Sequence, residues 1–528
     1  MYQALSRSSQ ARPRSTALDT LVLALAAIPL LATQLGAQVF TDITATAGVG
    51  LPNTLTESVA WGDYDNDGDE DLYLTSNGPN NLFRNDGGGN FTDVTGIAGV
   101  GDAGFSVGTA FGDLDNDGDL DLYVVTFMVG SDVLYRNDGP VGPGGETVFT
   151  NIAADAGVTD ESSSRGVAFV DYDRDGLLDI YVNAIGPDIL YRNLGDLNFE
   201  NVAAKLGVAT VGQGVGVVAT DLDNNGWLDL FTGNRSNDPN RLYTNTQSQF
   251  TDITVSAGIT EIGLGMGVLS LDYDNDLDFD LYWTSWPGGG VDPQPNALYE
   301  NLGNVGTAAD FAHGIMSFVD VATASGTEDA LGWGISCNAG DVDNDGWEDF
   351  FVTNGFDEST TPNVLFQNNT NGTFTDITAA IGGGDFDGRG VAFADFDNDG
   401  DVDLCVTGDT DAETRLWRND TDNGHRWLTL RLVGQVSNRS AIGARVEVET
   451  DLLTQVKEVS SGAGRGSQNS LPVEFGLGNS STIERVTIRW PHGFVQTLND
   501  VALDQQLTVL ETVEIFSDGF ESGNTSAW

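Results

Sequence analysis

The sequence predicts an all-β protein: a seven-bladed β-propeller followed by a small all-β domain. An aspartate-rich loop recurs seven times, at spacings of 50, 58, 50, 51, 69 and 54 residues. Strand-like runs frame each copy, and four such runs in each of seven units give 28 strands. A period of about 50 residues with four strands is typical of a propeller blade. Further alternating runs of lower charge follow the last unit, and they predict the second domain.

The first loop, GDYDNDGDEDLYL at 62–74, places aspartates on alternate positions. Two carboxylates about 5 Å apart repel by roughly 3 kcal/mol at an effective dielectric near 20, so a cluster of them needs a cation. Calcium suits the pattern, because EF-hand loops supply carboxylates at positions 1, 3 and 5, a glycine at 6 and a carbonyl at 7. These positions, with an aspartate at position 9 reaching back from the next strand, are Asp63, Asp65, Asp67, Gly68, Asp69 and Asp71. For a single copy, a solvated Asx turn would be the alternative.

Seven copies of the loop at nearly regular spacing argue against a solvated Asx turn. We therefore predict up to seven Ca²⁺ ions, each held by loop positions 1, 3, 5, 7 and 9. The predicted metal ligands, loop by loop, are Asp63, Asp65, Asp67, Asp69 and Asp71; Asp113, Asp115, Asp117, Asp119 and Asp121; Asp171, Asp173, Asp175, Leu177 and Asp179; Asp221, Asp223, Asn225, Trp227 and Asp229; Asp272, Asp274, Asp276, Asp278 and Asp280; Asp341, Asp343, Asp345, Trp347 and Asp349; and Asp395, Asp397, Asp399, Asp401 and Asp403.

Two of the loops depart from the pattern. Loop four has Asn225 at position 5, which removes one charge. Loop five has Leu277 where the other loops have glycine, and a left-handed turn costs a residue with a side chain roughly 1–2 kcal/mol. We therefore expect five stronger sites and two weaker or distorted ones, in loops four and five.

The runs around the loops predict how the ring closes. A run of the FTDIT type ends most units, but one already occurs at Phe40, before the first loop, and none follows RLWRN at Arg415. We expect residues 39–44 to complete the blade of Asp395, which removes an open sheet edge. The glycine-rich runs at Gly212 and Gly263 precede metal loops, so they are interpreted as close-packed inner strands rather than phosphate-binding loops.

The loop pattern, for example FGDLDNDGDLDLYV at 111–124, resembles the FG-GAP and related VCBS-type repeats of integrin alpha-subunit propellers. The resemblance covers residues 39–420, and it implies calcium binding in loops of this type. The chain departs from the family's namesake residues, since Phe-Gly survives clearly only at Phe111 and Gly112.

Residues 38–420 hold 65 acidic and 11 basic residues, whereas residues 421–512 hold 10 and 8. The acidic charge therefore belongs to the propeller and is largely charge of the predicted metal loops, which argues against a nucleic-acid mimic or a disordered tail. We expect no nucleic-acid partner. Residues 421–512 are similar to the ASPIC/UnbV domain of the cartilage acidic protein family. The matching residues are Asn438, Arg439, 441–446, 475–478, Trp490, Pro491 and Gly493.

The N-terminal residues predict secretion. Three arginines precede the apolar run LVLALAAIPLLA, and LGA at 35–37 offers a cleavage site, so residues 1–37 are interpreted as a signal peptide cut after Ala37. The run is too short to span a bilayer. We expect a secreted or cell-envelope protein, periplasmic or extracellular. The tail at 513–528 resembles short endings of some secreted bacterial proteins.

The chain shows no catalytic constellation. His313, His425 and His492 are scattered, without zinc spacing or Ser-His-Asp order. Cys337 and Cys405 lie beside the loops of adjacent blades, and they form either a bridge or two buried thiols. We predict that the chain is not an enzyme but an extracellular binding or adhesion module for a protein or glycan. The alternatives are a calcium-dependent hydrolase or lyase and a purely structural role.

One loop is a candidate partner site. The fifth unit carries WTSWPGGGVDPQP, in which Trp283 and Trp286 lie beside a glycine- and proline-rich segment. Such loops often carry function. The alternative is that Trp283 is a buried strand residue and that Trp286 packs under the loop.

Overall fold

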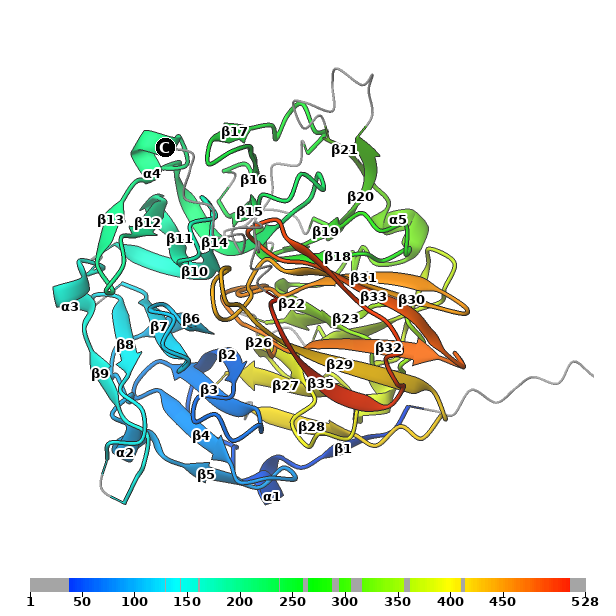
Figure 1. Ribbon diagram of the computed structural model, residues 1–528, viewed down its shortest axis with the longest axis horizontal. Coiled ribbons are helices and arrows are strands. Elements are labelled where there is room, and N and C mark those ends of the chain that lie inside the picture. The colour runs from blue at the N-terminus through cyan, green and yellow to red at the C-terminus, as the bar shows by residue number, and fades with distance from the viewer. Residues whose placement is uncertain are drawn as a thin grey trace, which may run out of the picture. The chain divides into compact units, whose positions relative to one another are not determined.

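Seven four-stranded units follow one another along the chain, coloured blue to yellow in Figure 1. The structure is a computed structural model that describes residues 38–512, except 129, 143, 160–161, 237, 260–264, 287–293, 305–315, 356–360 and 410–413. The predicted signal peptide, the C-terminal tail, His313 and the glycines at 288–290 lie outside the described residues. Among the helices that are described, none combines the length and apolar character needed to cross a membrane.

The blades contain strands β1 to β28, so the predicted total of 28 strands is confirmed. Within each blade the strands pair antiparallel in chain order. The first four blades are β2(Thr56–Gly62), β3(Asp71–Ser76), β4(Asn81–Asn85), β5(Phe91–Asp93); β6(Ser106–Gly112), β7(Asp121–Thr126), β8(Val133–Asn137), β9(Phe149–Asn151); β10(Ser163–Val170), β11(Asp179–Pro187), β12(Ile189–Asn193), β13(Phe199–Asn201); and β14(Val211–Thr220), β15(Asp229–Asn234), β16(Arg241–Asn245), β17(Phe250–Asp252). The last three are β18(Gly265–Leu271), β19(Asp280–Ser285), β20(Ala297–Asn304), β21(Met316–Asp320); β22(Gly334–Gly340), β23(Asp349–Asn354), β24(Val364–Asn368), β25(Phe374–Asp376); and β26(Gly388–Ala394), β27(Asp403–Gly408), β28(Arg415–Asn419) with β1(Phe40–Asp42).

The first strand of each blade lies innermost, and these strands neighbour one another in order, with β26 next to β2. The ring closes as predicted. Strand β1 pairs antiparallel with β28, with Phe40 opposite Asn419 and Asp42 opposite Trp417, so the chain's first strand completes its last blade. Blades three and four are also joined, because the end of β11 pairs with the start of β14.

A short helical turn follows the outer strand in six blades. These turns are α1(Thr44–Ala47), α2(Thr95–Ala98), α3(Ala153–Ala156), α4(Ala203–Leu206), α5(Ala322–Ser325) and the 3₁₀ turn η1(Thr378–Ile381). Each ends at a glycine in the left-handed conformation, for example Gly48 with φ 76°. The glycine turn expected from the sequence is therefore the C-cap of one turn of helix.

The hydrophobic core lies between adjacent blades. Blades one and two pack through Tyr73 and Phe111, whose rings meet edge to face with centroids 6.3 Å apart. The last blade packs on the first in the same way, since Trp61 stacks on Phe396 at 6.0 Å. The glycine-rich inner strands are close-packed as predicted: a Cβ on Gly216 would lie 2.3 Å from the carbonyl oxygen of Gly464.

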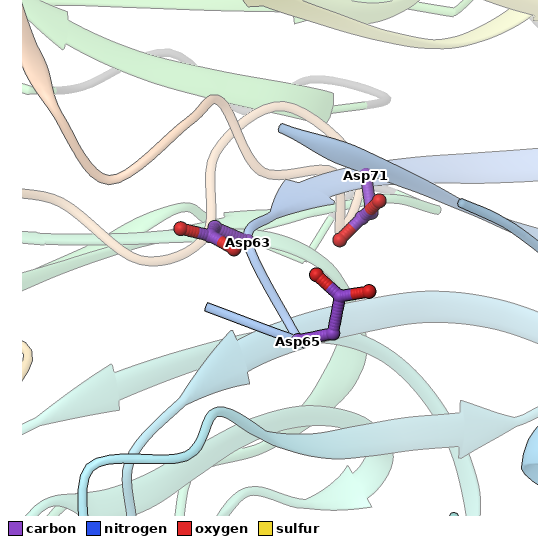
Figure 2. Close-up of side chains that lie close together, drawn as sticks. All are labelled: Asp63, Asp65 and Asp71. Carbon is purple, nitrogen blue, oxygen red and sulfur yellow. The ribbon is translucent and has the colours of Figure 1, made fainter. Parts of the chain in front are cut away.

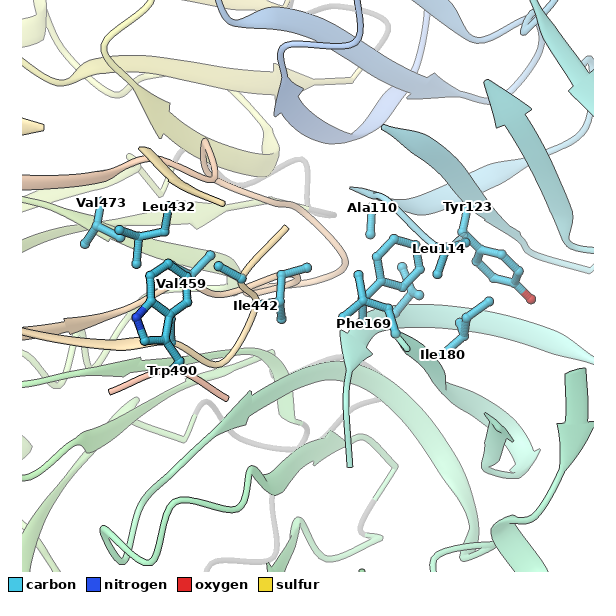
Figure 3. Close-up of a cluster of buried hydrophobic side chains, with 14 of the residues drawn as sticks. Ala110, Leu114, Tyr123, Phe169, Ile180, Leu432, Ile442, Val459, Val473 and Trp490 are labelled. Carbon is cyan, nitrogen blue, oxygen red and sulfur yellow. The ribbon is translucent and has the colours of Figure 1, made fainter. Parts of the chain in front are cut away.

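The C-terminal domain contains two sheets. One has the order β32-β29-β35 and the other β31-β30-β33-β34. The strands are β29(Arg426–Val433), β30(Arg445–Thr450), β31(Thr454–Glu458), β32(Val473–Gly478), β33(Ile483–Arg489), β34(Val495–Leu498) and β35(Gln505–Leu510). Figure 3 shows buried side chains of this domain, Trp490 and Ile442 among them, together with residues of blades two and three such as Phe169; all belong to one hydrophobic cluster.

The segment 459–472, between β31 and β32, enters the centre of the ring and touches all seven blades. It bonds the backbone of blades one, two, five and seven, through Gln468, Gly466, Gly464 and Ser470 respectively. In blade six, Asn469 Nδ2 donates to the carbonyl of Ala339 over 2.9 Å. Blades three and four approach Gly462 and Gly464 so closely that a Cβ would not fit between them. We call residues 459–472 the plug.

Candidate metal centres

Each predicted loop joins the two innermost strands of its blade. In the first blade, β2 ends at Gly62 and β3 begins at Asp71. Asp63, Asp65 and Asp71 each offer a carboxylate oxygen, and the three oxygens lie within 4.8 Å of one another. Figure 2 shows the Asp65 and Asp71 carboxylates facing each other. Asp63 and Asp71 are buried, so their charges are largely removed from water.

The described residues contain seven groups of at least three side chains that could hold a metal ion. Five of them are Asp63, Asp65 and Asp71; Asp113, Asp115 and Asp121; Asp171, Asp173 and Asp179; Asp221, Asp223 and Asp229; and Asp272, Asp274 and Asp276. In the sixth loop, the charges of Asp343 and Asp345 both act on Asp341. The structure therefore brings together side chains that the sequence predicted at positions 1, 3, 5 and 9.

One hydrogen-bond pattern shapes the loops. In loop one, the Asp63 carboxylate accepts from the N–H groups of Asp67 and Gly68, over 3.0 and 3.1 Å. The Asp71 carboxylate accepts from Tyr64 N over 3.1 Å, which ties the start of the loop to its end. The N–H at position 7 donates to the position 5 side chain, here from Asp69 to Asp67. The aspartates therefore fix the backbone of the loop as well as supplying ligand oxygens.

Loop four departs from this pattern. Asn225 N donates to Asp223 Oδ1 instead of to Asp221, and Asp221 Oδ1 is buried without a hydrogen-bond partner in the part of the chain that the structure describes. Loop five keeps the pattern: Leu277 N donates to Asp272 Oδ2 over 3.1 Å, as glycine does in the other loops. Leu277 nevertheless has φ 73°, so the predicted left-handed strain is present.

Position 4 of the loops was not singled out by the sequence analysis, yet it joins each loop to the next. Six loops have asparagine there and loop three has Arg174, all with φ between 55° and 60°. The Asn66 amide donates to Asp119 Oδ1 over 2.8 Å, and Asn398 in the last loop donates to Asp69 Oδ1 over 2.8 Å. Arg174 instead lies over the Trp227 ring at 4.1 Å. The asparagine of the recurring DND triplet was the sequence signal that could have identified position 4 as a link between loops.

The asparagine that ends each third strand was visible in runs such as VLYRN, but no role was predicted for it. Asn137 N donates to Asp121 Oδ1 over 2.9 Å, so it holds the position 9 carboxylate. Its side-chain amide donates to the carbonyl of Tyr64 in the preceding loop over 2.9 Å. Equivalent pairs occur in all seven blades, through Asn85, Asn137, Asn193, Asn245, Asn301, Asn368 and Asn419.

The loop carboxylates resist ionising together. Burial raises the pKa of Asp113 to about 7, and the charges of Asp117 and Asp115 add to the effect. Burial likewise raises the pKa of Asp171 to about 7 and that of Asp395 to about 8. The pKa of Asp71 lies well above its usual range for the same reason. A cation among these groups would remove the penalty.

The donor set fits a metal ion. Every candidate donor side chain at positions 1, 3, 5 and 9 offers oxygen, as hard cations such as Ca²⁺ and Mg²⁺ require. Oδ1 atoms of four loop aspartates are buried and have no hydrogen-bond partner among the described residues, namely Asp65, Asp173, Asp221 and Asp397. At position 7, the side chains of Asp69, Asp119, Asp278 and Asp401 accept from the position 4 asparagine of the preceding loop. This leaves the position 7 carbonyl as the predicted ligand group.

The C-terminal domain contacts the loops. Arg431 lies 3.0 Å from both Asp63 Oδ2 and Glu70 Oε1. Ser440 Oγ accepts from Asp113 N over 2.9 Å, and Glu474 Oε1 accepts from Asp395 N over 3.1 Å. The other four loops are approached by Val436 at Gly176, Glu458 at Asp221, Arg445 at Leu277 and Gly478 at Asn344. All seven loops therefore meet this domain.

The remaining predicted residues have ordinary structural places. Cys337 and Cys405 are buried free thiols, so they do not form a bridge. Trp283 is a buried residue of β19, as the alternative interpretation held, and Trp286 is half-buried beside Trp333. His425 Nδ1 lies 2.7 Å from the Asp343 carbonyl oxygen.

Comparisons with known proteins agree with this architecture. The FG-GAP-like repeat family matches residues 63–124, 221–283 and 341–406, and the ASPIC and UnbV family matches residues 434–515. The chain is thus a β-propeller of FG-GAP-like repeats followed by an ASPIC/UnbV domain.

Among individual proteins, the chain is similar to cartilage acidic protein 1 of Mus musculus, with 34% identity over 169 residues, and of Homo sapiens, with 31% over 175 residues. These matches cover 31% and 33% of this chain and only 24% and 25% of the relatives, so the chain spans about a quarter of their length. A lectin from Agrocybe aegerita that recognises non-reducing terminal N-acetylglucosamine aligns with a TM-score of 0.38 and 14% identity, over 72% of this chain and 93% of the lectin. That similarity is too low to bear on function.

Proposed function

We propose that this protein is a secreted, calcium-binding propeller that acts as an extracellular binding module. The observation that carries the proposal is the sevenfold recurrence of an aspartate loop in which, in the first five blades, three carboxylate oxygens converge within 4.8 Å of one another. In each loop, the side chains at positions 1, 3, 5 and 9 and the carbonyl at position 7 are the proposed ligands. FG-GAP-like repeats and the predicted N-terminal signal peptide support an extracellular location.

Calcium is favoured over magnesium. Calcium accepts six to eight oxygens in flexible geometry, whereas magnesium demands a near-ideal octahedron and usually keeps several waters. A loop offering up to four carboxylates and a carbonyl suits calcium, and weak sites of this kind would fill at the millimolar calcium of extracellular fluids.

The ions would have a structural role. Each loop contacts the next through position 4 and also contacts the C-terminal domain, as Asn66 with Asp119 and Arg431 with Asp63 illustrate. An ion held there would stabilise the contacts between blades and the docking of the C-terminal domain. We therefore place partner binding on surfaces other than the loop face.

A glycan and protein array probed with and without calcium tests the binding role. The proposal predicts a reproducible ligand that is lost on chelation and regained when calcium is restored. A ligand that binds equally well to chelator-treated, unfolded protein would contradict it, as would catalytic turnover of the bound molecule without stable binding.

A further inference from the structure

Every innermost strand carries a bulge at the end of the strand away from its metal loop. The register shifts at one equivalent place in all seven inner strand pairs. A bulge re-aims a side chain, and these bulges contain Glu57, Val107, Arg165, Val215, Met266, Ile335 and Arg389. All seven residues are buried. Because Val215, Met266 and Ile335 form one contact cluster although they come from three blades, the ring of bulge residues converges on the centre of the propeller.

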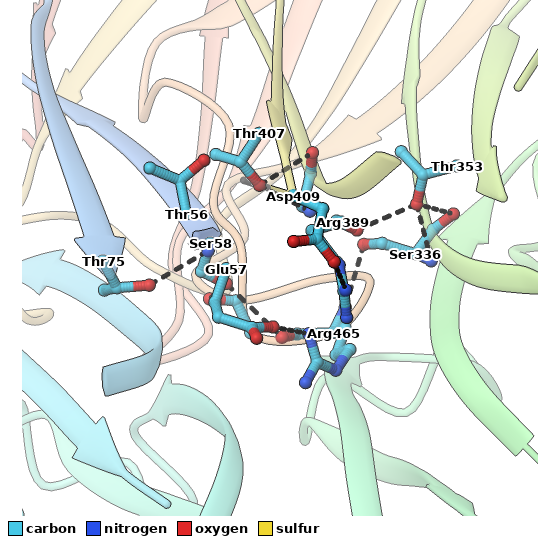
Figure 4. Close-up of polar contacts among 12 residues, drawn as sticks. Thr56, Glu57, Ser58, Thr75, Ser336, Thr353, Arg389, Thr407, Asp409 and Arg465 are labelled. Atoms are coloured by element: carbon cyan, nitrogen blue, oxygen red, sulfur yellow. Dashed lines mark hydrogen bonds and ion pairs between the residues drawn. The ribbon is translucent and has the colours of Figure 1, made fainter. Parts of the chain in front are cut away.

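Arginines gather at this place. Arg465, at the tip of the plug, forms an ion pair with Glu57, and both side chains are almost fully buried. Arg389 pairs with Asp409 and lies 3.6 Å from Asp387. Figure 4 shows Glu57, Arg389 and Arg465 drawn from β2, β26 and the plug, with a dashed line joining Arg465 to Glu57.

Two further arginines lack a carboxylate partner among the described residues. Arg165 is only 3% exposed, and its Nε is buried without a hydrogen-bond partner there. Its guanidinium lies over the Phe127 ring, 4.1 Å from the centroid. The positive charges of Arg465 and Arg235 and the negative charge of Glu57 all act on Arg165. The Nε of Arg235, which is half-buried, is also without a partner in the described chain.

Glu57 is already paired with Arg465, so three arginines share one carboxylate here, and a buried guanidinium without its own ion-pair partner is costly unless a further anion offsets its charge. The cost is conspicuous in a chain whose formal net charge is −57, because acidic residues were plentiful. The same ring of bulges also carries an apolar cluster: Trp286 packs against Val215, Met266 and Ile335 and meets Trp333 edge to face at 6.2 Å. A ligand that satisfies both the arginines and this cluster has an anionic group and an apolar body.

We propose that Arg165, Arg235 and Arg465 form a binding site for an organic carboxylate, whose apolar part lies against Trp286, the partly buried member of the apolar cluster. The carboxylate would accept charge-assisted hydrogen bonds from the guanidinium groups, for which planar arginine forks are well matched. The site lies away from the metal loops and does not depend on the ions for its charge. The test of this site can therefore fail or succeed independently of the calcium proposal.

Calorimetric titration of the calcium-loaded full chain with benzoate and with glucuronate tests the site, with benzamide and glucose as uncharged partners. We expect the carboxylates to bind and the uncharged partners not to bind. Binding of benzoate alone would assign an apolar acid, and binding of glucuronate alone would assign an acidic sugar. No binding of either would overturn the proposal.

The variant Arg165→Met separates a ligand site from an internal ion pair. If the Arg165 guanidinium binds the ligand, the affinity of the variant for the carboxylate falls by at least tenfold. The variant also melts at the same temperature as the parent or higher, because a buried charge has been removed. A lowered melting temperature together with unchanged carboxylate binding would show that the chain itself pairs Arg165, and would refute the site. Arg136→Met, at a partly exposed arginine paired with Asp138 in blade two, is the matched control and should leave carboxylate binding intact.

Discussion

The side-chain amide of Asn85 donates a hydrogen bond to the carbonyl of Phe396 over 2.7 Å, which joins the first blade to the last, 311 residues away along the chain. The same amide also donates to Glu70 O in its own loop over 3.2 Å. Because the pairing recurs in all seven blades, the end of each third strand holds the aspartate loop of the blade before it. The aspartate loops and the closure of the ring are thus parts of one hydrogen-bond network.

Asn85→Ala should destabilise the ring. The change leaves the buried carbonyls of Phe396 and Glu70 without these donors, at a cost of about 1–3 kcal/mol in the free energy of unfolding. Chemical unfolding of the parent and the variant in calcium-containing buffer measures this difference in the free energy of unfolding. Asn90→Ala is the control, because Asn90 Nδ2 bonds only the nearby Gly87 carbonyl at an exposed turn. Equal stabilities of the two variants would show that the link between blades contributes nothing.

Loop four should bind metal most weakly, and restoring its charge should strengthen it. Asn225→Asp supplies the missing carboxylate and allows the regular bond to Asp221, so we expect affinity at this loop to rise by on the order of tenfold. Asp117→Asn in loop two makes the reverse change and should lower affinity there. Calcium titration of both variants measures the affinity of the substituted loops. If the affinity changed in the same direction in both variants, loop charge would not be the cause of the weak binding at loop four.

The plug should depend on its glycines. Gly462 has φ 95°, and a Cβ there would lie 2.3 Å from the carbonyl oxygen of Val167. Gly462→Ala should therefore loosen the C-terminal domain from the ring and speed limited proteolysis near residues 421–425. Gly424→Ala has a similar φ of 76° but open space around it, so it isolates the backbone strain. If both variants resist proteolysis like the parent, the plug does not hold the domain.

Glu511 should make the C-terminal domain sensitive to acid. Burial acts to raise the pKa of Glu511, but the N–H groups of Gln435, Val436 and Ser437 outweigh burial and lower it. A lowered pKa means stability that is present above the ordinary pKa of glutamate and is lost as the pH falls through the lowered value. Glu511→Gln should cost about 1–3 kcal/mol at pH 7.

Melting curves of the parent and Glu511→Gln between pH 7 and pH 3 test this expectation. The difference between them should shrink as the pH falls, because the parent's carboxylate becomes protonated. Glu484→Gln, at an exposed glutamate of the same domain, should match the parent throughout. A difference that does not change with pH would show that the charge of Glu511 contributes nothing.

The blades, the loops and the closure by β1 could be predicted because each depends on a local pattern repeated seven times. The strain at Leu277 was predictable for the same reason, since glycine fills that place in the other loops. The plug could not be predicted, because its contacts join residues such as Gln468 and Val59 that are hundreds of positions apart, and its sequence has no periodicity. Its glycines at 462, 464 and 466 indicate a turn, but only the assembled ring shows what they approach.

Calorimetric calcium titration of the chelator-treated chain, combined with melting curves before and after, tests the central claim most directly. If the seven aspartate loops exist to hold calcium, several ions should bind per chain and the melting temperature should rise steeply, because ligands that bind the folded state stabilise it. Absence of calcium uptake, or a melting temperature indifferent to chelator, would contradict the account.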